Sequence, residues 1–214
     1  HYSSRRQRQM CIRDRTEKHD MMSKEGLYHA ASLVKRYAHL PMFFWSSIPC
    51  TGGSTAQRRN KFRQGHKERM AAHDRTFTKL HKNLMTLASM VLDETINGHF
   101  VFEWPYPNDW WSRKEIQHMM KKHNLKTVEF SGCRLGAKGQ SGRCIKKPWR
   151  LASTSQDMID EYKDLICNAE WRSTLSEAER CEHENHEMLE GSTKTALSAF
   201  YPVHMALKAH AVFN

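Results

Sequence analysis

The spacing of apolar residues predicts a helix and then a buried strand near the start of the chain. Residues 20–39 place apolar side chains at helical intervals, and Pro41 marks the end of that helix. The apolar run over 42–48 predicts a buried strand, which stops at a flexible stretch of small residues over 51–54. A polar and basic loop or loose helix is expected over 55–69.

Two further rounds of helix and strand follow this loop. Asp74 is expected to cap a helix whose apolar stripe runs over 77–91. The apolar run over 99–103 predicts a second buried strand. After an aromatic, proline-rich loop, Ser112 is expected to cap a short helix.

The remaining pattern contains two strands and several helices. Residues 126–133 and 146–154 predict a third and a fourth strand, which are close enough in the sequence to pair as a hairpin. Ser155 is expected to start a helix, and from about Asn168 the chain is helical and less regular. This order of elements favours an α/β layered fold with a largely parallel sheet and helices on both faces.

Three regions are expected along the chain. The stretch SSRRQRQMCIRDR has no apolar periodicity, and it resembles a translated sequencing-adaptor read-through. Residues 1–15 are therefore interpreted as a non-native basic tail, with a basic nucleic-acid arm as the alternative. Residues 16–160 are expected to form the α/β domain, whose N-terminal part would then be missing. Residues 161–214 are expected to form a helical extension.

The charge balance favours a polyanionic partner. The 214 residues carry a formal net charge of +11, and residues 1–15 contribute five Arg and one Asp, so about +7 remains without them. Nucleic acid is the first candidate, because its phosphates attract clustered Lys and Arg side chains.

Hydropathy and cysteine spacing indicate where the protein is expected to occur. Hydrophobic residues make up 39% of the chain, and no window approaches the roughly 18 apolar residues that a membrane helix needs. No apolar segment follows the basic start, so neither a secretory signal nor membrane association is expected. The six cysteines are irregularly spaced, which favours reduced thiols over a disulfide framework. An intracellular location, in the nucleus or cytoplasm, is therefore expected.

Reactive and basic side chains follow the predicted strands. Pro49-Cys50 follows the first strand, and Glu103 ends the second. In an open parallel sheet such side chains face one crevice. A thiol and a carboxylate can act together in that crevice if a substrate ring lies between them and the thiol attacks one ring atom. The alternative for Cys50 is a buried, inert thiol. The loop between the third and fourth strands adds three basic residues: Lys146, Lys147 and Arg150.

Three of these segments resemble, in the same order, motifs of the C5-type cytosine methyltransferases. They are SIPCTGGS, FVFEWP and GCRLGAKGQSGRCIKKPWRLAST, and the resemblance covers roughly residues 42–155. It implies a partial Rossmann-like methyltransferase sheet, S-adenosylmethionine as the methyl donor and a nucleic-acid substrate whose target base is flipped out of a duplex. The chain is also similar to uncharacterised retroelement-associated proteins of unicellular eukaryotes, which implies a context but no chemistry.

The resemblance implies roles for individual residues. Cys50 matches the nucleophile that adds to cytosine C6, and Glu103 matches the residue that holds the N3 edge of the ring. No residue is assigned to the cofactor. The residues expected to bind phosphate, base or other parts of the substrate are Lys146, Lys147, Arg150 and Trp104.

The chain departs from the family pattern at several points. Thr51 stands where the family usually has Gln, and Trp104-Pro105 stands where it has Asn-Val. The glycine-rich cofactor loop is not found in residues 16–40. The leading hypothesis is a cytosine-5 methyltransferase-like protein that acts on nucleic acid through a Cys nucleophile, and the missing cofactor loop argues against activity of this fragment by itself. The alternative is a catalytically silent nucleic-acid-binding module derived from a mobile element, and a third class is a plain interaction domain without salt-dependent nucleic-acid binding.

A second group of residues suggests metal chemistry. The stretch CEHENHE offers Cys181, His183 and His186, and the two histidines are three residues apart, so they can share one helical face. Zinc needs about four ligands, and the fourth is missing unless Cys167 or another distant residue supplies it. The competing interpretation is a solvated, His-rich helix surface. The sequence alone favours that interpretation, so no metal ligand is assigned.

Overall fold

A computed structural model of the chain describes residues 19–187 and 201–213. The basic tail expected over 1–15 therefore lies outside the described residues. The chain forms two compact units: unit 1 comprises the chain up to Gly52 together with Asn60–Phe100, and unit 2 comprises Gly53–Arg59 together with the chain from Val101 onward. The short helix α3 (Ala56–Asn60) falls at the boundary between them in the sequence.

Unit 1 is built on two helices. Ser23 caps the first one by accepting a hydrogen bond from the Gly26 amide at 2.8 Å. The two helices pack against each other, and Val34, Leu87 and Val91 form a buried cluster between them. The helix expected over 20–39 and a strand within 42–48 are both confirmed, but the strand is mostly half-buried and not buried as expected. The elements of this unit are α2 (Lys24–Arg36), β1 (Pro41–Ser46), α4 (His66–Glu94) and the first half of β2 (Ile96–Pro105).

The helix α4 begins earlier than the sequence pattern predicts. Gly65 precedes it with a φ of 68°, a left-handed conformation that glycine adopts at little cost. The helix then runs unbroken from His66, so Asp74 lies inside it and the expected cap is wrong. The apolar stripe itself is confirmed, because its buried members are Phe77, Leu84, Leu87, Ala88 and Val91.

The sheet contains four strands in the order β1-β2-β4-β3. The strands β3 (Lys126–Ser131) and β4 (Pro148–Ser153) pair antiparallel, with Val128 opposite Leu151, which confirms the expected hairpin. Strand β4 also pairs antiparallel with β2, where Glu103 lies opposite Leu151. The expectation of a largely parallel sheet is therefore wrong for these pairings. A parallel pair needs a crossover connection, whereas β3 returns directly to β4 and β4 then inserts beside β2.

The core of unit 2 covers both faces of β2. Residues 101–104 are all buried, which happens only when both faces of a strand are covered. On one face, Phe102 and Trp104 contact the ring of Trp111, with centroids 5.5 and 5.6 Å apart. On the β3–β4 hairpin, Phe130 contacts the ring of Tyr162 at 4.9 Å. These aromatic residues, with Trp149, are called the aromatic core below.

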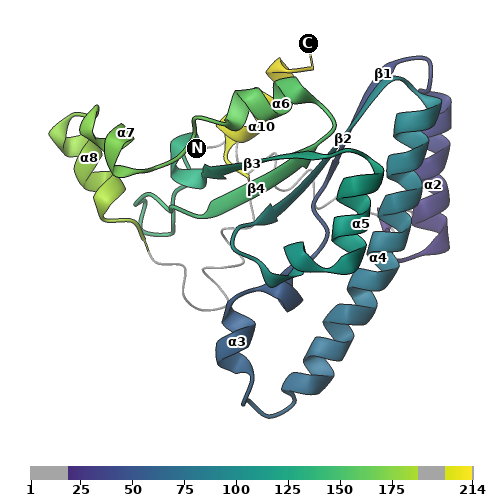
Figure 1. Ribbon diagram of the computed structural model, residues 1–214, viewed down its shortest axis with the longest axis horizontal. Coiled ribbons are helices and arrows are strands. Elements are labelled where there is room, and N and C mark those ends of the chain that lie inside the picture. Colours follow the sequence, from purple (N-terminus) through teal and green to yellow (C-terminus); the bar gives the residue numbers. More distant parts are fainter. Residues whose placement is uncertain (1–18, 188–200, 214) are drawn as a thin grey trace. The chain divides into compact units, whose positions relative to one another are not determined.

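Five further helices lie in the described part of the unit. The helix α5 (Lys114–Lys122) begins after Arg113 without a side-chain cap, so the expected Ser112 cap is wrong, although Ile116 is buried as predicted. The helix α6 (Gln156–Tyr162) starts at Ser155, whose hydroxyl accepts from the Met158 amide as expected. Figure 1 shows α6 lying along β3 and β4, which it contacts. The short helices α7 (Ala169–Ser173), α8 (Glu177–Glu184) and α10 (Val203–Ala211) follow.

None of the helices in the described part of the chain combines the length and the hydrophobicity that a bilayer crossing requires.

Candidate functional site

Four side chains with metal-ligating atoms converge in unit 2. They are Cys133, Cys167, His183 and His186, and one ligand atom from each lies within 4.8 Å of all the others. Both cysteines are buried and both histidines are half-buried. We call these four residues the Cys/His cluster.

The end of strand β3 places the two cysteines. Cys133 lies in a 3-10 turn directly after β3, and Gly136 closes that turn with a φ of 80°. Cys167 follows α6, and its amide donates to the Ser131 hydroxyl at 3.0 Å. The Ser131 amide in turn donates to the Leu165 carbonyl at 2.8 Å. These bonds hold the segment after α6 against the end of β3, beside Cys133.

Helix α8 and the residues directly after it bring the two histidines to the same place. Ser176 and Glu179 form a capping box at its start, which stabilises the first turn. His183 Nδ1 lies 3.8 Å from the Cys167 sulfur, and His186 Nε2 lies 3.7 Å from it. His183 lies in the last turn of α8, whereas His186 lies two residues beyond the helix end, after the Asn185 cap. The expectation that the two histidines share one helical face is therefore wrong, and the chain after the helix carries His186 to the same sulfur.

Burial sets the protonation of the cluster. It raises the pKa of the Cys133 thiol far above its ordinary value, and the neighbouring Cys167 sulfur adds to the rise. Burial also lowers the pKa of both His183 and His186. Without a cation, the cluster therefore holds a protonated Cys133 thiol and neutral imidazoles at neutral pH.

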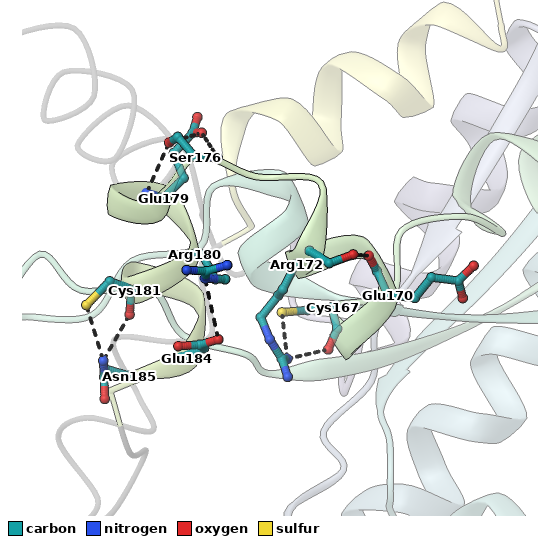
Figure 2. Close-up of polar contacts among 10 residues, drawn as sticks. Cys167, Glu170, Arg172, Ser176, Glu179, Arg180, Cys181, Glu184 and Asn185 are labelled. Carbon is teal, nitrogen blue, oxygen red and sulfur yellow. Dashed lines mark hydrogen bonds and ion pairs between the residues drawn. The ribbon is translucent and has the colours of Figure 1, made fainter.

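Aromatic and cationic side chains surround the cluster. The ring of Trp171 meets His183 edge-on, with centroids 4.8 Å apart. The guanidinium of Arg134 lies 3.9 Å from the centroid of the Trp171 ring. Arg172 points at Cys167, as Figure 2 shows, and its Nη1 lies 3.4 Å from the Cys167 carbonyl oxygen and 3.9 Å from the sulfur.

Cys181 lies outside the cluster although the sequence groups it with the histidines. Its side chain is exposed, and its sulfur accepts from the Asn185 side-chain amide at 3.5 Å (Figure 2). Residues two apart on a helix point in different directions, so Cys181 and His183 do not share a face. The sequence thus identifies both histidines and names Cys167 as a possible fourth ligand, but it misses Cys133.

The two residues expected to be catalytic belong to different units. Cys50 is half-buried and follows β1 in unit 1, as the sequence predicts. Glu103 is buried within β2 in unit 2, and its carboxylate accepts a hydrogen bond from the Tyr201 hydroxyl. Their joint action on a substrate ring stays a prediction.

The residues expected to bind substrate differ in their surroundings. Trp104 is fully buried in the aromatic core, so its indole packs there and its stacking on a base stays a prediction. Arg150 donates from Nε to the Glu129 carboxylate at 3.1 Å and lies 4.2 Å from the centroid of the Tyr106 ring. Lys147 lies 4.6 Å from the centroid of the Trp149 ring, and Lys146 is exposed.

An open hollow of about 330 Å³ lies on α7 and α8. Its lining is mainly polar. The hollow lies outside residues 42–155, the segment that resembles the methyltransferases, so it does not support a cofactor site in that segment. The lining residues are Ala169, Arg172, Ser173, Arg180 and Glu184.

Comparisons of the chain with protein-family models, with curated proteins and with solved structures find no match.

Proposed function

We propose that this protein binds nucleic acid through the backbone phosphates, using the segment Lys61–Arg69 of unit 1, which we call the basic segment. The observation that carries the proposal is a group of exposed cations around an exposed aromatic ring at the start of a helix. The cations are Lys61, Arg63, Lys67 and Arg69, and all four are exposed. The only acidic residue within the segment is Glu68.

The start of α4 is suited to an anion. The first amide groups of a helix have no partner within the helix and carry a partial positive charge. Gly65 supplies no side-chain cap for them. Lys67 and Arg69 add full positive charges to the first turn, which repel the helix dipole unless an anion compensates. A phosphate group bound here satisfies the amides and the cations together.

Phe62 supports a single-stranded or unpaired ligand. Its side chain is 91% exposed, although it lies between two cations. The Lys61 ammonium lies 5.9 Å from the centroid of its ring. Exposed aromatic rings beside a positively charged track bind nucleic acid by stacking on bases, with each stacked base contributing about 1–3 kcal/mol.

The first turns of α4 contain no fully buried residue. The helix is described in full, and its first buried residue is Phe77. The exposed turns before Phe77 are therefore available to a partner, whereas the later turns pack against α2.

A salt-dependent binding assay tests this proposal. The full chain is titrated into labelled single-stranded DNA, single-stranded RNA and duplex DNA, and the affinity is measured by fluorescence anisotropy at several salt concentrations. Replacing Lys61, Arg63 and Lys67 by Gln together is expected to reduce the slope of log affinity against log salt. Each lost phosphate contact reduces that slope by about 0.7–0.9.

The matched control removes three charges from another part of the same unit. Lys24, Lys35 and Arg36 on α2 are replaced by Gln, which changes the net charge equally. The control is expected to keep most of the slope. If both triple variants reduce the slope equally, the binding depends on the total charge of the protein and not on the basic segment. If the unchanged protein does not bind at low salt, the proposal is wrong.

Methyl transfer to cytosine, on a Rossmann-like sheet, is a second candidate function. One observation favours it: Cys50 follows the half-buried strand β1 and keeps part of its surface accessible, as a nucleophile requires. In the reaction the Cys50 thiolate forms a bond to cytosine C6. Carbon C5 then takes the methyl group from S-adenosylmethionine, which leaves as the thioether, and loss of the C5 proton releases the enzyme.

A trapping assay tests this second candidate. With 5-fluorocytosine in the duplex, fluorine takes the place of the C5 proton, so the covalent adduct remains. The adduct is expected to disappear in Cys50→Ser and to persist in Cys181→Ser, which removes another thiol with an accessible surface. No adduct with the unchanged protein means that Cys50 is not a nucleophile toward cytosine.

A further inference from the structure

We propose that the Cys/His cluster is a structural zinc site, in which Cys133, Cys167, His183 and His186 bind one zinc ion and hold the segment 167–187 in its fold. This inference is independent of nucleic-acid binding, because it concerns unit 2 and rests on the cluster alone.

The spacing of the ligand atoms fits a tetrahedral ion. Zinc lies about 2.3 Å from a thiolate sulfur and about 2.0–2.1 Å from an imidazole nitrogen, so at tetrahedral angles these two atoms are about 3.6 Å apart. The Cys167 sulfur lies 3.8 Å from His183 Nδ1 and 3.7 Å from His186 Nε2. The ligand atoms already stand close to the positions that a zinc ion requires, and only small side-chain movements are needed.

The segment 167–187 lacks an apolar core of its own. Helices α7 and α8 are five and eight residues long, both are described in full, and neither contains a buried residue. Helices this short are not stable without tertiary contacts. The buried residues beneath them are Cys133, Cys144 and Cys167, with Trp171 packed against them. A segment with so little buried surface commonly depends on a structural metal or a disulfide.

Two thiolates and two imidazoles specify the metal. This ligand set in a tetrahedral arrangement is typical of structural zinc, whereas magnesium and calcium prefer oxygen ligands. All four positions are filled by the protein, and the cysteines are buried, so no open position is left for water or substrate. The site is therefore closed, as structural zinc sites are, and not catalytic.

The surrounding groups compensate the charges that zinc binding creates. Binding displaces the thiol protons of Cys133 and Cys167, which leave as solvent protons, and the two thiolates balance the charge of the ion. The backbone amide of Arg134 hydrogen-bonds to the Cys133 sulfur and favours its thiolate form. Arg172 lies beside the Cys167 sulfur. The amide contact stabilises the Cys133 thiolate, which burial alone disfavours.

Two further cysteines lie near the cluster but do not belong to it. The Cys144 thiol is buried and hydrogen-bonds to the Glu182 carboxylate across 3.7 Å. The Cys181 sulfur faces Asn185 and is exposed. Cys181 is only two residues from His183, so its substitution changes the same helix without removing a proposed ligand. It is the matched control for the experiment.

Metal analysis of the full chain tests the proposal. The protein is purified from cells grown with zinc, and zinc is measured against protein by elemental analysis. One zinc per chain is expected in the unchanged protein and in Cys181→Ser. Cys133→Ser and His186→Gln are expected to lose more affinity than the roughly 10- to 100-fold that changes around a metal site cause.

Cobalt substitution tests the site even where the serine variants do not fold. Co²⁺ in the unchanged protein is expected to show the strong visible bands of a tetrahedral site and a near-ultraviolet band from two thiolates. Cys133→His keeps four ligands and is expected to bind Co²⁺ with only half of the thiolate band. The proposal is wrong if the unchanged protein is folded with reduced thiols and binds neither ion. It is also wrong if Cys181→Ser loses metal as Cys133→Ser does, or if Cys133 and Cys167 are joined in a disulfide.

Discussion

The aromatic core and the segment 167–187 belong to the same unit, but they bury side chains in opposite ways. In the aromatic core, β2 buries four consecutive residues, 101–104, on both faces of the strand. In the segment 167–187, helices α7 and α8 contain no buried residue, and the interior consists of thiols, imidazoles and one indole. The first region is stabilised by apolar area removed from water, and the second depends on polar atoms that need a cation.

This difference has a consequence for how each region fails. An apolar core loses stability gradually as side chains are trimmed, because each removed group costs its own share of buried area. A segment held by a metal ion loses its fold when the ion leaves. The ligand side chains then lie close together without the ion that each of them bound. The two regions should therefore respond to different perturbations, and four experiments separate them.

Removal of the metal is expected to have the largest effect. A chelator should release the segment 167–187 and leave the aromatic core folded, since structural zinc contributes about 10–16 kcal/mol of apparent binding energy in small zinc domains. Hydrogen exchange followed by mass spectrometry measures both regions in one experiment. Added zinc should restore protection, and equal loss of protection in both regions would mean that they fold as one.

Truncation in the aromatic core is expected to have the opposite pattern. Trp104 is fully buried and contacts Phe102 and Trp111. Trp104→Ala should lower the free energy of unfolding by about 3–5 kcal/mol. Denaturant unfolding measures this loss, and the metal content of the folded fraction should not change. A loss of zinc from folded protein would show that the core positions the cluster.

A smaller effect is expected at the indole that joins the cluster to its surroundings. Trp171 contacts both His183 and Arg134, and a cation–π contact contributes about 0.5–2 kcal/mol. Trp171→Leu keeps an apolar side chain but removes both contacts. Zinc affinity, measured by competition with a chromophoric chelator, should fall by about tenfold. Unchanged zinc affinity would mean that Trp171 contributes to packing and not to metal binding.

The smallest effect concerns the docking of the C-terminal helix. The Tyr162 hydroxyl donates to the Met205 carbonyl at 2.7 Å, and Met205 on α10 is buried. Tyr162→Phe should cost about 0.5–1.5 kcal/mol, because it removes one buried hydrogen bond. Thermal unfolding measures the change. If Tyr162→Phe lowers the stability equally with and without chelator, α10 belongs to the aromatic core and not to the metal-held segment.

Local sequence rules predict most of the elements correctly. The apolar stripe over 77–91 has the helical period, and residues 100–102 form a continuous apolar run, so each element follows from neighbours in the chain. Ser155 is a correct cap because it directly precedes its helix. The caps expected at Asp74 and Ser112 are wrong, because the chain starts those helices elsewhere: Gly65 opens the first, and the second begins after Arg113.

Sequence reasoning names three members of the Cys/His cluster but assigns no metal to them. His183 and His186 stand three residues apart in the sequence, which is a local signal, although only His183 lies within α8. Cys181 is closer to them in the sequence than Cys167 is, yet it points elsewhere. Cys133 is far from both histidines along the chain, so no local pattern links it to them.

The sequence by itself determined where the helices and strands form, the pairing of the β3–β4 hairpin and the availability of two histidine ligands. Only the tertiary structure decided that β4 inserts beside β2 and that Cys133 and Cys167, not Cys181, complete the Cys/His cluster. Local periodicity depends on neighbours within about one or two turns of chain. The position of β4 and the choice of cysteines depend on contacts between residues far apart in the sequence, which the packing of the whole unit determines.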